Sequence, residues 1–118
     1  MQYVWRYRKA QSIQKKEVNV LLVYVAHCYE GNPENLEKAK KITHDLQIKD
    51  YENVYVCPLL MFSHLKYGEI GFETEMELCL DILSVCDRLL VASRKSKGVN
   101  LEIDFANLVG MEVCALEK

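Results

Sequence analysis

The stretch RLLVASRKSKGVNLEIDFA, residues 88–106, joins a buried strand to an amphipathic helix through a short basic loop. Its first part, Arg88–Ala92, is a short apolar run that is typical of a fully buried strand. Apolar residues then return at helical spacing over Leu101–Val109, which predicts a helix there. Residues 93–100 are polar and basic, with Ser, Gly and Asn interrupting the apolar pattern. The stretch therefore predicts a strand, a loop and a helix in succession.

This succession also predicts a binding site, because ligands of open parallel sheets bind beyond the carboxyl ends of the strands. The loop offers the Ser96 hydroxyl, and the helix start offers unpaired N–H groups and a positive dipole end. Arg94, Lys95 and Lys97 add positive charge, so the loop is a candidate phosphate seat. Glu102 is expected in the first helical turn, where its carboxylate would act on the other end of a phosphorylated sugar. The plainer interpretation is that Ser96 only caps the helix and Glu102 only complements its dipole.

The composition of the chain is that of an ordinary globular domain. It has 118 residues, of which 50% are hydrophobic and 27% charged, and a formal net charge of −2. This length predicts one domain with a substantial core, and this charge gives no reason to expect a nucleic-acid polymer as partner. The chain has no apolar run of about 18 residues, so no membrane span or membrane partner is predicted. Since its beginning lacks the apolar core of a signal peptide, a cytoplasmic location is expected.

The first sixteen residues differ from the rest in charge. Residues 1–16 contain basic side chains and no acid, and Tyr3, Trp5 and Tyr7 alternate with other residues. We therefore predict a basic, aromatic N-terminal arm over 1–16 and a single domain over 17–118. Aromatic side chains are enriched at protein interfaces, so the arm is a candidate contact between subunits of a homo-oligomer.

The cysteines predict neither a disulfide framework nor a metal site. Their number is odd and no Cys-x-x-Cys spacing occurs among them; they are Cys28, Cys57, Cys79, Cys86 and Cys114. Buried free thiols in a reducing compartment are the expected state, and neither a metal nor a cofactor is predicted. A separate hypothesis makes Cys28 a nucleophile with His27 or His64 as its base, although adjacent His and Cys side chains seldom meet.

The remaining segments complete an alternating pattern of strands and helices. Further strands are predicted at Val18–Ala26, Asn53–Cys57 and Met111–Leu116, and a helix at Phe72–Val85. Another helix should begin at Asn32-Pro33, and residues 59–71 are expected to be an irregular lid or pocket wall. The order β-α-β-α-β-α-β predicts an α/β fold: a three-layer α/β/α sandwich, flavodoxin-like or Rossmann-like, with a parallel sheet of four to five strands.

Several of these stretches together are similar to a known family. They are VYVAHCYEG at 23–31, CP at 57–58, CDRLLV at 86–91 and SKGVNLEI at 96–103. Over about residues 18–113 the chain resembles the nucleoside 2-deoxyribosyltransferase-like superfamily, and most closely its small bacterial and phage branch. The resemblance implies the fold predicted above and a homo-oligomer in which a neighbouring subunit completes each pocket.

The resemblance also implies a reaction: cleavage of the N-glycosidic bond of a nucleoside or nucleoside 5′-monophosphate, with water or another base accepting the sugar. Glu102 matches the carboxylate that attacks the anomeric carbon and forms a covalent sugar–enzyme intermediate. Ser96 matches a serine of the monophosphate hydrolases, where the transferases have an acid. The candidate substrate-binding residues are Tyr24, His27, Cys28, Tyr29, Gly31, Ser96, Gly98 and Asn100.

The chain departs from the family pattern at three places, one of which is His27-Cys28, where the family often has Gly-Pro or Ser-Pro. Cys79 stands where an acid is expected to protonate the leaving base, and Glu77 and Asp81 lie two residues away on either side. Asp81 is the second catalytic candidate, although residues two apart on a helix face different ways; Glu75 would serve in another helix register. Glu30 stands where related proteins often have Arg, and its charge would repel phosphate. These departures favour an alternative: a non-catalytic nucleotide-binding or sensing module with the same pocket.

Overall fold

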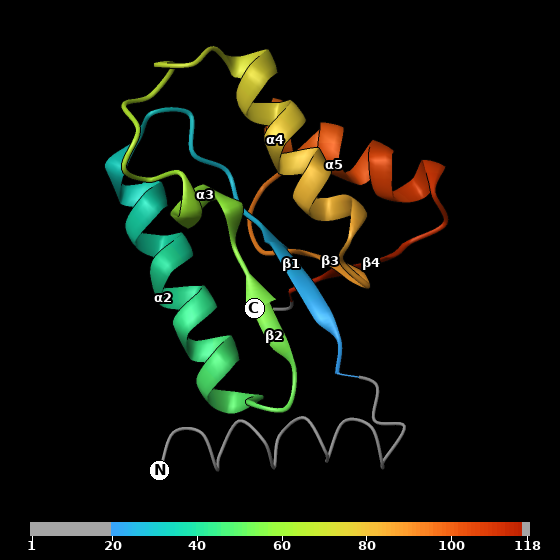
Figure 1. Ribbon diagram of the computed structural model, residues 1–118. Coiled ribbons are helices and arrows are strands. Elements are labelled where there is room, and N and C mark those ends of the chain that lie inside the picture. Colours follow the sequence, from blue (N-terminus) through green and yellow to red (C-terminus); the bar gives the residue numbers. More distant parts are fainter. Residues whose placement is uncertain (1–19, 117–118) are drawn as a thin grey trace, which may run out of the picture.

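The computed structural model describes residues 20–116 and has the α/β architecture that the sequence predicts (Figure 1). The part of the chain described forms one sheet of four parallel strands with helices on both faces. The predicted arm over 1–16 and the predicted strand start at Val18 lie outside the described residues. In chain order the elements are β1 (Leu22–Ala26), α2 (Pro33–Lys49), β2 (Val54–Val56), α3 (Pro58–Met61), α4 (Phe72–Ser84), β3 (Arg88–Val91), α5 (Lys97–Leu108) and β4 (Glu112–Ala115).

The strand order of the sheet is β2-β1-β3-β4, which puts β1 and β3 at its centre. Tyr24 of β1 pairs in register with Leu89 of β3, and Val25 with Leu90. From β1 the chain moves outward to β2 on one side, then crosses back to β3 and continues to β4. Because such crossovers are right-handed, α2 lies on one face of the sheet and α4 and α5 on the other, as Figure 1 shows. The direction of winding therefore reverses between β1 and β3, which is where ligands bind in such sheets.

The hydrophobic core has one part on each face of the sheet, because successive strand residues point to opposite faces. On the α4–α5 side, Tyr24 packs with helix residues such as Leu83 and Ala106. On the α2 side, Val25 packs with Ala39, and Ile42 and Leu46 of the predicted inner helix face join them at the edge. These two parts of the core fix the positions of the helices that surround the carboxyl ends of the strands.

The signals for the first long helix are confirmed. Asn32 caps α2 by accepting a hydrogen bond from the Glu34 N–H at 3.0 Å, and Pro33 is its first residue. At the end of α5, Gly110 has φ +75°, the left-handed conformation that glycine adopts without strain after a helix.

The start of α5 differs from the prediction. The helix begins at Lys97 rather than at Leu101, because the Ser96 hydroxyl accepts a hydrogen bond from the Val99 N–H at 3.3 Å and caps it. A good cap offsets the weak helix propensity of glycine and asparagine in the first turn. Glu102 consequently lies in the second turn of the helix, not in the first as predicted.

The segment predicted to be irregular, residues 59–71, is mostly so, but its beginning belongs to a short helix. α3 includes Pro58 at its first position, where proline's fixed φ and missing N–H suit a helix start. Beyond α3 the chain runs through turns to Gly71, which immediately precedes α4. This loop lies beside the carboxyl end of β1, the place expected of a pocket wall.

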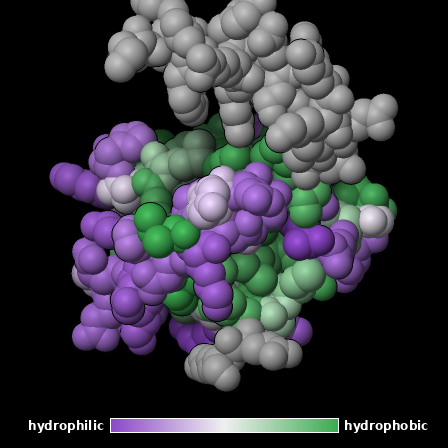
Figure 2. All heavy atoms as spheres, turned by 90° about the horizontal axis from the view of Figure 1, so that it is seen from below, coloured by the Kyte–Doolittle hydropathy of each residue, from purple (hydrophilic) through white to green (hydrophobic). Residues whose placement is uncertain are grey.

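The amino-terminal end of the sheet carries a mixed surface. Seen from below, hydrophobic patches lie between hydrophilic ones (Figure 2). Ile48 near the end of α2, Val54 at the start of β2 and Val85 after α4 are exposed hydrophobic residues. Among helices within 20–116, none has the length and apolar character needed to cross a membrane.

Candidate functional site

A cavity of about 390 Å³ opens at the carboxyl ends of β1 and β3, and we call it the α4–α5 cavity after the helices that line it. Its volume is within the range of small-molecule sites, and its position is the point where the winding of the sheet reverses. Its lining residues are Tyr24, Val25, His27, Tyr29, Glu30, Leu59, Tyr67, Phe72, Glu75, Met76, Cys79, Ser96, Lys97, Gly98, Val99 and Glu102.

A buried carboxyl group and a buried phenol meet at this cavity. Glu102 on α5 is 7% exposed and Tyr24 on β1 is 1% exposed, and the tyrosine hydroxyl donates a hydrogen bond to the Glu102 carboxylate. Burial raises the pKa of Glu102 to about 7, while the hydrogen bond from Tyr24 opposes this rise. Burial and the adjacent Glu102 charge raise the pKa of Tyr24, so the phenol keeps its proton. Glu102 therefore exchanges its proton near neutral pH, as a nucleophile or a general base should.

Ser96 lies in the same cavity as Glu102, so the two residues are not separated by packed side chains. Its hydroxyl oxygen is occupied by the Val99 N–H, as the capping interpretation requires. Only one of the three basic side chains predicted to hold a phosphate lines the cavity. Lys97 lines the cavity, whereas Arg94 and Lys95 do not; the Arg94 guanidinium pairs with the Glu30 carboxylate.

Aromatic side chains form part of the cavity wall. The rings of Tyr29 and Tyr67 meet edge to face, with centroids 5.4 Å apart and planes at 90°. Gly31 is required here, because a Cβ on it would lie 3.1 Å from the Tyr67 ring and its φ is +74°. The Lys97 ammonium lies 4.8 Å from the centroid of Phe72. Such flat apolar surfaces suit a planar heterocycle.

Helix α4 presents Cys79 and Glu75 to the cavity but not Asp81. Asp81 is exposed on α4 and does not line the cavity, because a residue two positions from Cys79 is rotated by about 200° around the helix. Burial, and then the negative charge of Glu102, raises the pKa of the Cys79 thiol to about 12. Glu75 is one turn before Cys79 on the same side of α4. The cavity thus contains a thiol at the predicted acid position and a carboxyl group one turn away.

Not all of the other predicted site residues line the α4–α5 cavity; Gly31 lines neither this cavity nor a second one. A second cavity, of about 450 Å³, lies between α2 and the carboxyl ends of β1 and β3, and we call it the α2-side cavity. Cys28, 3% exposed, lines this one and not the α4–α5 cavity, whereas His27 lines both. Asn100 is exposed and lines neither.

The structure brings no histidine nitrogen to the Cys28 thiol among the contacts of residues 20–116. The His27 Nδ1 atom instead lies 2.8 Å from the Cys28 carbonyl oxygen. His64 is exposed in the loop after α3 and lines neither cavity. The arrangement gives the Cys28 hypothesis no base.

Six lining residues were missed by the sequence analysis as individual site residues: Val25, Leu59, Tyr67, Phe72, Met76 and Val99. Two signals could have found some of them. Leu59 and Tyr67 belong to the segment predicted as a pocket wall, and Phe72 follows it at the start of α4. Met76 lies one turn from Phe72, and its sulfur is 3.4 Å from where a Cβ on Gly98 would be. A Cβ on Gly98 would therefore make an ordinary van der Waals contact with Met76 beside the cavity.

No group of His, Cys, Asp or Glu between residues 20 and 116 is arranged to hold a metal ion. Comparison with protein-family models and with curated proteins gives no significant match.

Proposed function

We propose that this protein cleaves the N-glycosidic bond of a nucleoside, with Glu102 as the nucleophile and water or a second base as the acceptor of the sugar. The observation that carries the proposal is the buried Glu102 carboxyl group, hydrogen-bonded by Tyr24 inside a cavity of small-molecule size. A carboxylate in this setting is the usual nucleophile of retaining glycosyl transfer.

The proposed reaction has two displacements. In the first, a Glu102 carboxylate oxygen bonds to the anomeric carbon of the sugar, and the bond from that carbon to the base nitrogen breaks. The electron pair of the broken bond stays on the base, which takes up a proton and departs. In the second, water or another base attacks the anomeric carbon, gives up a proton and releases the Glu102 carboxylate. The Tyr24 hydroxyl supports both steps by orienting this carboxyl group.

The charges around the cavity favour a nucleoside over a nucleoside 5′-monophosphate. Three acids line it, Glu30, Glu75 and Glu102, and Lys97 is the cationic side chain among its lining residues. Arg94 is paired with Glu30 at the mouth. A phosphate dianion would therefore meet more negative than positive charge, whereas the aromatic wall suits an uncharged base.

The proposal is tested by incubating the protein with a panel of 2′-deoxynucleosides, ribonucleosides and their 5′-monophosphates and measuring free base by chromatography. We expect release from at least one nucleoside, and a sugar adduct on Glu102 in the mass spectrum of trapped enzyme. Glu102→Ala should abolish both signals, while Asp104→Ala, a change at an exposed acid on the same helix, should leave them intact. Absence of base release from every compound would refute the proposal.

One observation favours a second candidate function, a module that binds a nucleoside without cleaving it. Cys79, with its pKa of about 12, is a poor proton donor at the position where an acid is expected. Under this alternative a nucleoside raises the melting temperature in proportion to the logarithm of its concentration and is recovered intact. Thermal-shift measurements followed by chromatography of the bound compound separate the two functions.

A further inference from the structure

We propose that Glu75 is the catalytic acid that protonates the leaving base, one helical turn away from the position that Cys79 occupies. This inference rests on the proposed function and assigns a residue to its first step. It is carried by the geometry of α4, which presents Glu75, Met76 and Cys79 to the cavity.

A proton donor is needed because a base that leaves as an anion is a poor leaving group, and general acids commonly accelerate such steps. Cys79 is next to the reacting carboxyl group, since the Glu102 charge acts on its thiol. A buried thiol that holds its proton this tightly does not supply it near neutral pH. The Tyr24 phenol is likewise unsuited, because it already donates to Glu102 and its pKa is raised.

Glu75 has the position that a donor to the base requires. Four residues along a helix correspond to about 6 Å along its axis, so Glu75 lies about that far from Cys79 on the same face. The Glu75 charge also acts on the Cys79 thiol, which places both side chains in one electrostatic environment. A sugar in contact with Glu102 would extend its base past Cys79 toward Glu75 and the aromatic wall.

The other ionisable groups of the cavity are less available. The Glu30 carboxylate is paired with Arg94, and the His27 Nδ1 atom is hydrogen-bonded to the Cys28 carbonyl oxygen. The Lys97 ammonium lies against the Phe72 ring. Glu75 is half-buried, and its carboxyl group makes no hydrogen bond or ion pair with another side chain between residues 20 and 116. It is thus an unengaged carboxyl group facing the substrate space.

In the proposed step, the Glu75 carboxyl O–H bond breaks as the glycosidic C–N bond breaks. The proton goes to the base, which leaves neutral, and the sugar stays bonded to Glu102. The Glu75 carboxylate then takes the proton of the attacking water or incoming base in the second displacement. The proton balance is restored, and no further reactant is needed.

The test compares two leaving groups on the same sugar. One substrate is the nucleoside that the wild-type protein cleaves fastest; the other is the 4-nitrophenyl glycoside, whose nitrophenolate leaves without needing a proton. We expect Glu75→Gln to lower kcat/KM for the nucleoside by about a hundredfold or more, and to change nitrophenolate release by less than about threefold. Glu75→Asp should retain part of the activity.

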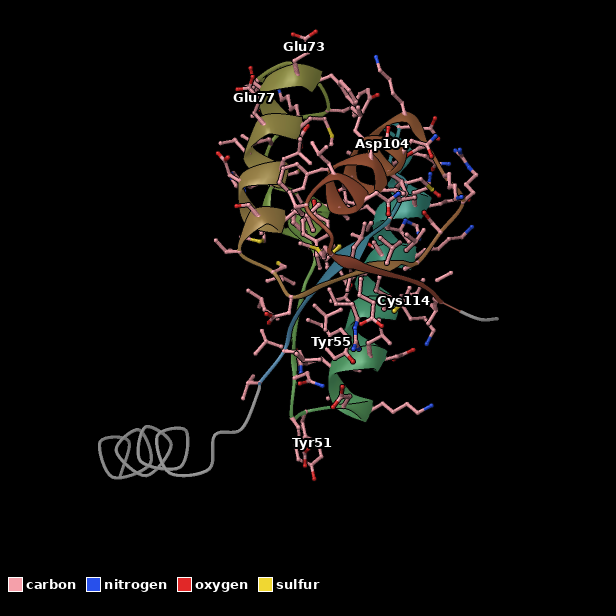
Figure 3. The ribbon with its side chains drawn as sticks, turned by 90° about the vertical axis from the view of Figure 1, so that its right-hand side faces the viewer. Tyr51, Tyr55, Glu73, Glu77, Asp104 and Cys114 are labelled. Carbon is pink, nitrogen blue, oxygen red and sulfur yellow. The ribbon has the colours of Figure 1, made fainter. Side chains whose placement is uncertain are left out.

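Two acids on the same helix are matched controls. Glu73 and Glu77 are exposed and lie on the outward side of α4 (Figure 3), two residues from Glu75 on either side. Glu73→Gln and Glu77→Gln remove the same charge without removing a cavity group, so both should behave as wild type. Melting temperatures of all three variants should agree within a few degrees.

The inference is overturned if Glu75→Gln stays within about threefold of wild type on the nucleoside, or if it slows both substrates equally. Glu102→Gln serves to separate the two levels, because loss of the nucleophile must stop both substrates. If wild-type protein cleaves neither substrate, the proposed function fails and this inference fails with it. If Glu102→Gln is inactive but Glu75→Gln is not impaired, only the assignment of the acid is wrong.

Discussion

The two cavities lie at the same edge of the same sheet, but their surroundings differ in chemistry. The α4–α5 cavity holds the buried Glu102 carboxyl group and a wall of aromatic rings. The α2-side cavity holds Lys38, Lys41 and Asp45, which are exposed, and a salt bridge of 3.1 Å joins the last two. The loops that follow β1 and β3 contribute residues to both cavities, and His27 lines both.

The difference shows that the covering helices decide the chemistry available on each face of the sheet. Two helices, α4 and α5, enclose the first cavity and remove Glu102 from water, which raises its pKa to about 7. A single helix borders the second, so its charged groups stay in solvent. There, hydrogen bonds from His44 and Lys41 lower the pKa of Asp45. One acid is kept reactive by burial and the other is kept ionised by its exposed partners.

The largest expected effect is on catalysis. Glu102→Gln should lower the rate of base release by at least about a thousandfold, because the nucleophile of a covalent mechanism cannot be replaced by its amide. Lys38→Gln, a change in the α2-side cavity, should stay within about twofold of wild type. Steady-state release of free base measures both. Comparable losses in the two variants would mean that the cavities do not divide as we describe.

The second prediction concerns stability and has opposite signs in the two cavities. Since burial raises the pKa of Glu102 from 4.5 to about 7, the folded state holds its proton more tightly than the unfolded state. Ionisation therefore destabilises the fold as pH rises from 4.5 to 7, and the penalty is complete above 7. The shift corresponds to about 3 kcal/mol. Glu102→Gln, which resembles the protonated acid, should raise the free energy of unfolding by up to that amount at pH 8 and by little at pH 4.5.

The matched variant for stability is Asp45→Asn. Since hydrogen bonds lower the pKa of this exposed acid, its ionised form stabilises the fold, and this contribution is lost as pH falls through its folded-state pKa. The variant should be slightly less stable than wild type at pH 7 and equal to it in strong acid. Urea unfolding followed by circular dichroism at several pH values measures both variants. If Glu102→Gln changed the free energy of unfolding equally at all pH values, burial would not raise the pKa of Glu102 as described.

A smaller effect is expected from removing the phenol that contacts Glu102. The hydrogen bond from Tyr24 holds the pKa of Glu102 down, so Tyr24→Phe should raise this pKa further. The acidic limb of the kcat/KM profile, expected near pH 7, should move upward, and the rate at pH 7 should fall about fivefold for a shift of one pKa unit.

The control for this change is Tyr55→Phe. The hydroxyl of Tyr55 on β2 (Figure 3) donates a hydrogen bond to the Asp50 carboxylate at 2.7 Å, and Tyr55 lines neither cavity. Its loss should leave the pH profile unchanged. A pH profile that is the same for Tyr24→Phe and wild type would show that the phenol does not tune Glu102.

The smallest effect concerns substrate charge. Glu30→Gln removes one acid from the mouth of the α4–α5 cavity and frees Arg94. The ratio of kcat/KM for a nucleoside 5′-monophosphate to that for the nucleoside should rise by up to about fivefold, since a single exposed charge contributes at most about 1 kcal/mol. Glu34→Gln, at an exposed acid that lines neither cavity, is the control. An unchanged ratio would mean that Glu30 does not select against phosphate.

Much of the fold was predictable because its signals are local. The cap at Asn32-Pro33, the glycine after α5 and the apolar runs of the strands each follow from the chemistry of a few neighbouring residues. The helix start at Lys97 was not predicted, because Gly98 and Asn100 are weak helix formers and the decisive hydrogen bond comes from the Ser96 side chain.

The candidate site was predictable only in part. Tyr24, Ser96 and Glu102 were singled out, and they do line one cavity. Asp81 and Cys28 were also predicted as site residues, but the structure does not place them in this cavity, because their directions depend on helix phase and on which face of the sheet a loop turns to. The aromatic wall at Tyr67 and Phe72 comes from a loop whose path no periodicity fixes.

The order of apolar and polar residues was sufficient to specify an α/β chain with a parallel sheet, since alternation, caps and turns act over a few residues. The meeting of Tyr24 with Glu102 joins positions that are 78 residues apart, and the pairing of Glu30 with Arg94 joins positions 64 apart. Such contacts exist only once the crossovers have set β1 beside β3. Burial by α4 and α5 then makes Glu102 different from the other acids of the chain, because a pKa responds to desolvation and to neighbours in space rather than in sequence.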